Sequence, residues 1–175
     1  MTSEGGGTVT VIDTASQKVV KSFSAGDRPR SVTFSPDGKR AYVSSELGGQ
    51  LIAIDTATQS MTAKTPITGD APKPMGLAVA ADGKAVFVST GRGGTLVRVG
   101  QDGSQKAVAV GARPWGIALS PDGKLVYTAN GQSNDLTIVA GGDMKEVGRI
   151  KSGGRPWGVK VGPAPPGATC KVTNP

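Results

Sequence analysis

The chain has 175 residues, a formal net charge of +7, one cysteine and no histidine. This length suits one domain with a sizeable core. The absent histidine excludes histidine-ligated copper, zinc or iron and histidine-assisted Ser or Cys catalysis, and the lone Cys170 excludes an intrachain disulfide. The positive charge has two possible interpretations. The lysines and arginines lie on exposed loops and strand edges without a specific role, or they attract an anionic partner.

The first elements are two short runs, Thr8–Asp13 and Lys18–Ser24. Both are rich in β-branched residues, and together they predict the third and fourth strands of an incomplete four-stranded sheet.

Residues 29–68 predict a complete four-stranded sheet. The runs 31–35 and 40–45 flank Pro36-Asp37-Gly38-Lys39, whose proline and glycine are typical of a hairpin turn. The runs 51–55 and 61–68 give two further strands, joined by a turn in which Asp55 can bond its own backbone. No segment has an apolar period long enough for a helix, so the fold class is all-β.

Weaker or stronger copies of this segment begin at Pro74, Pro114 and Pro156, about 40 to 45 residues apart. In the third copy Trp115, Ile117 and Leu119 alternate with small residues, which is typical of a sheet that packs on both faces. Such repeats indicate a β-propeller of four-stranded antiparallel blades. Three blades are expected to be complete (29–68, 74–110 and 114–151), and a fourth to be split between the N-terminal strands and a lone strand at 156–161.

The hairpin Pro-x-x-hydrophobic-x-hydrophobic-Ser-Pro-Asp-Gly-Lys, followed by 41–45 and 51–56, resembles the YVTN-repeat β-propeller family. The resemblance covers nearly all of residues 7–162. It implies bacterial surface-layer or periplasmic proteins, some associated with quinoprotein-dependent alcohol catabolism, and a general likeness to seven-bladed lactonase-type propellers. The copies that begin at Pro74 and Pro114 depart from the pattern at 99–103 and 139–142 respectively.

Met1 aligns with Val43, inside a strand, when residues 1–9 are placed on residues 43–51. Because a GTG valine codon can serve as a start, we expect the natural protein to continue upstream, with further blades and a signal peptide that would direct it to the periplasm or outside the cell. Residues 1–162 would then be part of a seven-bladed propeller. The remaining residues, 163–175, form a Pro/Gly-rich tail that we expect to be extended.

An open arc would expose a blade face of about 300 Å², on the order of 8 kcal/mol of apolar burial. If the chain were complete, a strained four-bladed ring or a ring of two copies, closed through the end strands, would be expected.

Basic residues precede each of the four prolines, which places them on one rim of the propeller near the central channel. Cations at a channel mouth suit a carboxylate or phosphate ligand, whereas bonds to carbonyls or to neighbouring acidic loops would make them structural. The tryptophans have a similar alternative: they line the channel for stacking or pack between blades. The predicted rim site comprises Arg28, Lys73, Arg113, Arg155, Arg92, Glu46, Trp115 and Trp157.

Catalytic and metal-binding residues are not predicted. Asp37, Asp82 and Asp122 are interpreted as turn residues, and Glu46 is the best single carboxylate for a lactonase-like general base, although the sequence shows no partner for it. The predicted function is a non-catalytic scaffold, without cofactor, that binds a protein or a small anionic ligand at the rim. The alternatives are an accessory protein or enzyme of lactonase or quinoprotein type and, with only 4% aromatic residues against it, a single-stranded nucleic-acid binder.

Overall fold

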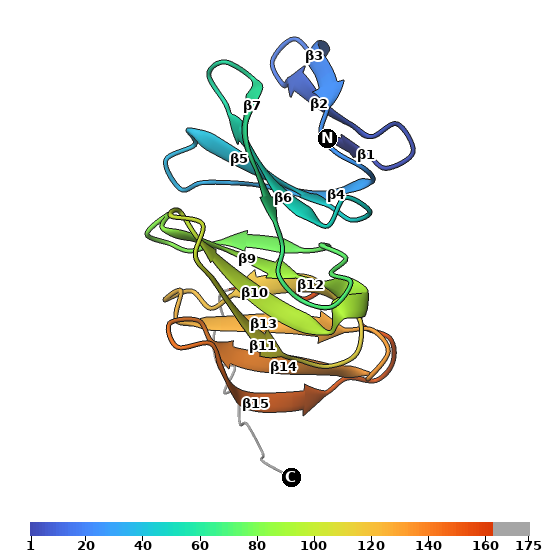
Figure 1. Cartoon of the computed structure of the whole chain (residues 1–175), viewed down its shortest axis with the longest axis vertical. Helices are drawn as coiled ribbons and strands as arrows, with labels where there is room; N and C mark the ends of the chain where they lie inside the picture. Colours follow the sequence, from blue (N-terminus) through green and yellow to red (C-terminus); the bar gives the residue numbers. More distant parts are fainter. Residues whose placement is uncertain (163–175) are drawn as a thin grey trace.

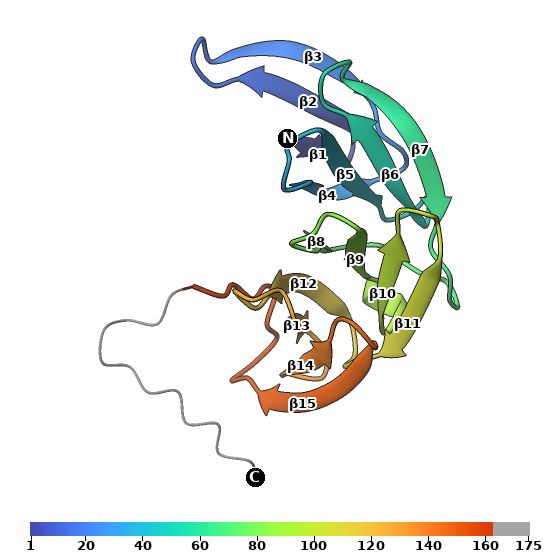
Figure 2. The ribbon, with the colours of Figure 1, turned by 90° about the vertical axis from the view of Figure 1, so that its left-hand side faces the viewer.

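Residues 1–162 are described by the computed structural model, which is an open arc of four β-sheets (Figures 1 and 2). The predicted tail, 163–175, and Cys170 lie outside the described residues. Figure 2 shows the sheets standing side by side like blades around an axis, with β4, β8 and β12 on the concave side and β3, β7, β11 and β15 on the convex side. None of the described residues forms a helix long and apolar enough to cross a membrane. The all-β propeller prediction is confirmed.

Each of the last three sheets has four antiparallel strands in chain order, and the first sheet has three. Blade 1 contains β1 (Thr2–Ser3), β2 (Thr8–Asp13) and β3 (Lys18–Ser24). Blade 2 contains β4 (Pro29–Phe34), β5 (Arg40–Ser45), β6 (Gln50–Asp55) and β7 (Ser60–Pro66). Blade 3 contains β8 (Leu77–Val79), β9 (Ala85–Ser89), β10 (Thr95–Gly100) and β11 (Gln105–Ala109). Blade 4 contains β12 (Pro114–Leu119), β13 (Leu125–Asn130), β14 (Asp135–Ala140) and β15 (Lys145–Lys151).

The turn between the first two strands of each complete blade has the chemistry that its sequence predicts. In blade 2 Asp37 accepts hydrogen bonds from the Ser35 hydroxyl (2.6 Å) and from the Lys39 amide (3.0 Å), while Gly38 has φ 69°. The Ser35 hydroxyl, and after it the Lys39 amide, lowers the pKa of Asp37. Asp82 and Asp122 accept amide hydrogen bonds from Lys84 and Lys124 in the same way. Their assignment as turn residues is confirmed.

The hydrophobic core lies between blades rather than inside one sheet. One cluster joins blades 1 and 2, through residues such as Val9, Val43 and Ile52. A second joins blades 2 and 3, with Leu51 and Val88 among its buried members, and a third joins blades 3 and 4. Each blade therefore covers the apolar face of its neighbour, as expected for a sheet that packs on both faces.

Hydroxyl groups tie neighbouring blades together near the channel. The Ser44 hydroxyl donates to the Met75 carbonyl, and the Ser89 hydroxyl donates to the Trp115 carbonyl, both at 2.6 Å. Thr2 makes the equivalent bond to the Arg30 carbonyl at 3.2 Å. Ala129 occupies this position in blade 4 and has no hydroxyl, so the amide of Gly116 supplies the bond to the next segment, at the Trp157 carbonyl.

Several local features differ from the predictions. Residues 91–93 form a 3-10 turn in the loop after β9, and β8 begins at Leu77 rather than at Pro74. Residues 156–161, which the sequence predicts to be a lone strand, are described by the structure but form no strand. The register also shifts between Pro114 and Ile117 in β12. This irregularity breaks the simple alternation of the first strand, so Trp115 does not join Ile117 and Leu119 in the cluster between blades 3 and 4.

Candidate functional site on the rim

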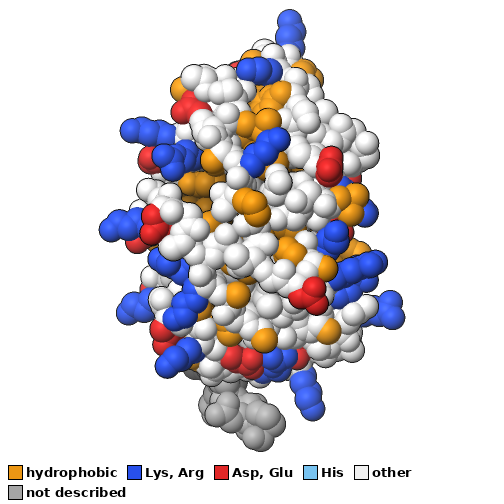
Figure 3. Space-filling model, viewed as in Figure 1, with side chains coloured by type: hydrophobic (Ala, Val, Ile, Leu, Met, Phe, Trp, Pro, Cys, Tyr) orange, Lys and Arg blue, Asp and Glu red, His pale blue; other side chains and the backbone are white. Residues whose placement is uncertain are grey.

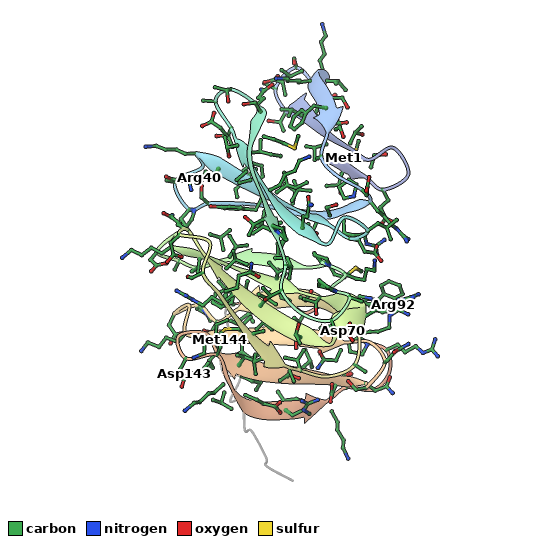
Figure 4. The ribbon with its side chains drawn as sticks, in the orientation of Figure 1. Met1, Arg40, Asp70, Arg92, Asp143 and Met144 are labelled. Carbon is green, nitrogen blue, oxygen red and sulfur yellow. The ribbon has the colours of Figure 1, made fainter. Side chains whose placement is uncertain are left out.

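The loops that carry the predicted site residues lie at one edge of the arc, and the hairpin turns lie at the other. Figure 4 shows Arg92 and Arg40 at opposite edges of the molecule. On the face drawn in Figure 3, lysine and arginine side chains project around the outline, with acidic side chains between them. The rim is formed by the loop between the second and third strands of each blade and by the connection to the next blade.

A cleft of about 790 Å³ opens on this rim between blades 1 and 2, and we name it the mixed cleft because it contains both acidic and basic side chains. Its lining residues are Glu4, Gly5, Gly6, Gly7, Ser24, Gly26, Asp27, Arg28 and Leu47. The glycine-rich loop at residues 5–7 leaves the cleft wide, because these residues have no side chains to fill it.

Two arginines and two glutamates form a network of ion pairs at the mixed cleft. Arg28 Nε lies 3.2 Å from Glu4 Oε2 and 3.3 Å from Glu46 Oε2. Arg30 pairs with Glu4 and lies 3.5 Å from Glu46. The hydrogen bond from Arg30, followed by that from Arg28, lowers the pKa of Glu4, which therefore stays ionised at neutral pH.

The sequence shows no partner for Glu46, whereas in the structure Arg28 Nε and Arg30 Nε lie 3.3 and 3.5 Å from its Oε2 atom, which is buried and has no hydrogen bond among the described residues. Arg30 extends from β4 and Arg28 from the connection before it, so both reach the loop that follows β5. Glu46 does not line the mixed cleft, whereas Glu4 does. Glu4, rather than Glu46, is therefore the candidate carboxylate for a general base at this cleft.

A second cleft, of about 410 Å³, occupies the equivalent position between blades 3 and 4. We name it the basic cleft, since it is lined by Arg92, Gly94, Ala112, Arg113 and Gln132. Neither arginine has a salt bridge to any acidic residue within 1–162. Arg113 Nε is buried and has no hydrogen-bond partner among the described residues.

The backbone of the two clefts is the same. The Arg28 carbonyl accepts from the Glu46 amide, and the Arg113 carbonyl accepts from the Gly131 amide, each at 3.0 Å. Arg28 and Arg113 have φ 55° and 53°, in the left-handed region that non-glycine residues seldom adopt. Both precede a proline. Each connection is thus fixed in one strained conformation that directs an arginine to the rim.

The two tryptophans stack on one another at the channel side of the rim. Their ring centroids lie 3.8 Å apart, with 25° between the planes. The guanidinium carbon of Arg113 lies 5.1 Å from the Trp115 ring, close enough for a cation-π contact. A side chain at Gly131 would collide with the Trp115 ring, so this glycine makes room for it. The stack joins blade 4 to the segment after it, and Trp157 remains 67% exposed.

A buried polar network lies beneath the basic cleft. Asn130 donates to Asp135 Oδ1 and to the Thr137 hydroxyl, both at 2.8 Å. Ser133 donates to the same Asp135 oxygen and accepts from the amide of Ala112, a cleft residue. Arg149 pairs with Asp135 Oδ2 at 2.9 Å. Burial acts to raise the pKa of Asp135, but the hydrogen bonds from Arg149, Asn130 and Ser133 outweigh it and lower the pKa.

The other predicted rim residues stand apart from these clefts. Lys73 lies at the connection between blades 2 and 3, where its carbonyl faces Gly91. Arg155 has φ 29°, and its amide donates to the Asn134 side chain. Sequence reasoning missed Glu4 and Arg30. The alignment of residues 1–9 on 43–51 places Glu4 opposite Glu46, and this repeat position is the signal that could have found it.

Comparison with known proteins gives one family and many similar folds. The family model described as "Lactonase, 7-bladed beta-propeller" matches residues 7–160. No curated protein matches the chain.

Three solved structures illustrate the similarity. Hydrazine synthase of Kuenenia stuttgartiensis is 29% identical, with a TM-score of 0.69 over 74% of this chain and 38% of its own. The periplasmic gluconolactonase of Pseudomonas aeruginosa is 27% identical, with a TM-score of 0.62 over 74% of this chain and 41% of its own. A proposed 6-phosphogluconolactonase of Bacteroides fragilis is 20% identical, with a TM-score of 0.74 over 88% and 51%.

The chain spans about half, or less, of the length of these solved structures. Its four sheets are thus a partial propeller. Since the family model covers most of the sequence and the fold agrees with it, the chain belongs to the family of seven-bladed β-propeller lactonases.

Proposed function

We propose that the protein is a lactonase-type propeller that binds a small sugar-derived lactone at the rim and hydrolyses it at the mixed cleft. The single observation that carries this proposal is the meeting of Glu4, Asp27 and Arg28 around one open cleft. Two of the similar solved structures are a periplasmic gluconolactonase and a proposed 6-phosphogluconolactonase, which supports a ligand of this class. The YVTN-type subfamily and a quinoprotein association stay predictions.

Lactone hydrolysis needs a group that accepts a proton from water and a group that stabilises the negative charge on the carbonyl oxygen. In this proposal Glu4 accepts the proton of the attacking water, and Arg28 donates hydrogen bonds to the developing oxyanion. The acyl C–O bond of the ring then breaks, and the proton passes to the departing ring oxygen. The product is a hydroxy acid, whose new carboxylate also suits Arg28.

The contacts of these residues support their roles. Glu4 is half exposed at the cleft, and its lowered pKa keeps it as a carboxylate. Arg28 is held from one side by Glu46, so its guanidinium is positioned before a ligand enters. Glu46 and Arg30 are positioning residues in this scheme, because they act through Arg28 and Glu4.

The test is hydrolysis of glucono-1,5-lactone, followed by acid release, with the wild-type protein and the Glu4→Gln variant. The variant should lose about a hundredfold or more in kcat with little change in KM. Glu146→Gln, which alters an ion pair on β15, serves as the matched control and should keep the wild-type rate. A wild-type protein that neither binds nor hydrolyses the lactone would refute the proposal.

A non-catalytic binding scaffold is the second candidate. The observation that favours it is that Arg28 and Arg30 each contact Glu4 and Glu46, so these ion pairs also clamp blade 1 to blade 2. Tight binding of the hydroxy acid together with a background rate of lactone hydrolysis would support the scaffold over the enzyme.

A further inference from the structure

We infer that the basic cleft is a second binding site, separate from the mixed cleft, for the carboxylate or phosphate group of a small anionic ligand. This inference does not depend on the proposed lactone hydrolysis. The cleft brings Arg92, from the loop after β9, to the same opening as Arg113, from the connection before β12. Two blades supply its walls, and each of them is a complete four-stranded sheet.

Charge is the first argument. Arg28 and Arg30 at the equivalent mixed cleft are neutralised by two glutamates, and Arg149 is neutralised by Asp135 and Glu146. The two arginines of the basic cleft have no such pairs within the described residues, and no acidic residue lines this cleft. Two uncompensated guanidinium groups at one opening attract an anion.

The buried donor at Arg113 is the second argument. Its Nε–H group is shielded from solvent without a hydrogen-bond partner in residues 1–162, and a buried unsatisfied donor costs about 1 to 3 kcal/mol. Arg113 lines the cleft, so an oxyanion that enters would satisfy this donor once the side chain turns toward the opening, because guanidinium groups bind carboxylate and phosphate through two parallel N–H donors. The ring of Trp115 supports the guanidinium from the side.

Rigidity is the third argument. Arg113 is held in a strained left-handed conformation before Pro114, and the neighbouring Ala112 carbonyl accepts from the Gln132 amide at 3.0 Å. The Ala112 amide is fixed in turn by the Ser133 hydroxyl. A site whose backbone is fixed before binding loses little entropy when the ligand arrives. The side-chain amide of Gln132 offers a further donor at the same opening.

The chain carries its own reporter for this site. Its two tryptophans are the stacked pair, and one of them contacts Arg113. Titration with inorganic phosphate should therefore change the tryptophan fluorescence in a saturable way, while potassium chloride at equal ionic strength should not. Gluconate, titrated in parallel, distinguishes a carboxylate ligand from phosphate.

Variants locate the site. Arg92→Ala and Arg113→Ala should each weaken phosphate binding about tenfold, and the double variant should abolish the saturable change. Arg113→Lys, which keeps the charge but loses Nε and the forked donors, should lie between wild type and Arg113→Ala. Arg40→Ala removes the same charge at the opposite edge of the molecule and should bind as wild type.

Three results would overturn the inference: no saturable response to either anion, equal displacement by chloride, or equal weakening in the Arg40→Ala protein. Lactone hydrolysis that persists in the Arg92→Ala/Arg113→Ala variant supports the separation of the two clefts. Loss of hydrolysis in that correctly folded variant, judged by circular dichroism, would refute the separation. Phosphate binding without any hydrolysis by the wild type would refute the proposed function and leave the basic cleft intact.

Discussion

The mixed cleft and the basic cleft occupy the same place in the repeat, yet one balances its charges and the other does not. Their connections have the same φ at Arg28 and Arg113 and the same carbonyl hydrogen bonds. At the mixed cleft Glu4 lines the opening and Glu46 pairs with Arg28 behind it, whereas the loops of blades 3 and 4 add Arg92 and Gln132 to the basic cleft. A repeated backbone thus provides several equivalent openings, and loop side chains decide what each can bind.

The floors of the two clefts, by which we mean the side chains that lie directly beneath each opening, differ as well. Beneath the mixed cleft, a side chain added at Gly26 would meet Ile52 and Ser45. Beneath the basic cleft, one added at Gly111 would meet Ser133, Asn130 and Asp135. The basic cleft therefore rests on a polar network, which makes its stability depend on hydrogen bonds that a mostly apolar floor does not need.

The largest expected effect tests this polar floor. Asp135→Ala should lower the free energy of unfolding by about 3 kcal/mol, because buried Asn130 and the guanidinium of Arg149 lose their acceptor. Gln50→Ala, at the equivalent repeat position under the mixed cleft, should change it by less than about 0.5 kcal/mol. Urea unfolding measures both, and equal losses would remove the distinction between the floors.

The substitution Gly111→Ala tests the packing of the same polar floor, where Asp135→Ala tests its hydrogen bonds. Its methyl group would fall on three side-chain atoms of the polar floor, the closest being the Ser133 hydroxyl, so we expect a loss of about 2 kcal/mol in urea unfolding. Gly142→Ala is the control, since nothing lies within 4 Å of its added carbon. A Gly111→Ala protein as stable as the control would show that the floor can rearrange freely.

Removing the acids should make the two clefts alike. In an Arg92→Ala/Arg113→Ala background, the further change Glu4→Gln with Glu46→Gln frees Arg28 and Arg30 from their partners. We expect phosphate affinity at the mixed cleft to rise about tenfold, or about 1.4 kcal/mol, by isothermal titration calorimetry. Unchanged affinity would mean that cleft shape, rather than charge balance, separates the two sites.

The reverse change adds an acid to the basic cleft. Gln132→Glu places a carboxylate at the opening shared by Arg92 and Arg113, and it should weaken phosphate binding about fivefold, or about 1 kcal/mol. Tryptophan fluorescence measures the titration. Gln59→Glu, in the turn between β6 and β7, has the same charge change and should have no effect on binding.

Acid titration should reveal the smallest difference. The folded-state pKa of Asp135 lies below its ordinary value, so the ionised carboxylate stabilises the fold above about pH 4. That contribution is lost as the pH falls through the folded pKa. The Asp135→Asn protein should therefore lose less stability than wild type between about pH 4 and pH 2. Parallel pH profiles for the two proteins would contradict this assignment.

The fold was largely predictable because the same four-strand pattern recurs several times along the sequence. The turn Pro36-Asp37-Gly38-Lys39 has a local physical cause and reappears as expected in the complete blades, whereas the predicted alternation after Pro114 holds only for Ile117 and Leu119. The third blade departs in its sequence but keeps its contacts: Gln101 donates its side-chain amide to the Gly83 carbonyl where Thr56 donates its hydroxyl to the Gly38 carbonyl. Local replacement of this kind preserves the fold and hides the repeat.

The site was less predictable, because ion pairs between side chains of neighbouring blades cannot be inferred from the sequence of any single repeat. The four basic residues before the prolines lie outside the strands, in connecting segments, but their partners depend on which loop faces them. Arg28 meets Glu4 from the preceding blade, 24 residues away, and Arg113 meets no acid within 1–162. The register shift that carries Trp115 out of the core cluster recurs in β4, between Pro29 and Val32, so it belongs to the repeat and not to β12 alone.

The hydroxyl bonds between blades have a consequence for how the molecule comes apart. The hydroxyls of Thr2, Ser44 and Ser89 link each of the first three blades to the next one, whereas Ala129 of blade 4 has no hydroxyl, and the Gly116 amide bonds the Trp157 carbonyl there instead. Thermal opening should begin there, and amide protons of residues 155–162 should exchange with solvent before those of β4 and β8. A serine introduced at position 129 would slow this opening, because it restores the missing hydroxyl. The stacked tryptophans, one of which lies in the segment that opens, would then stay together longer.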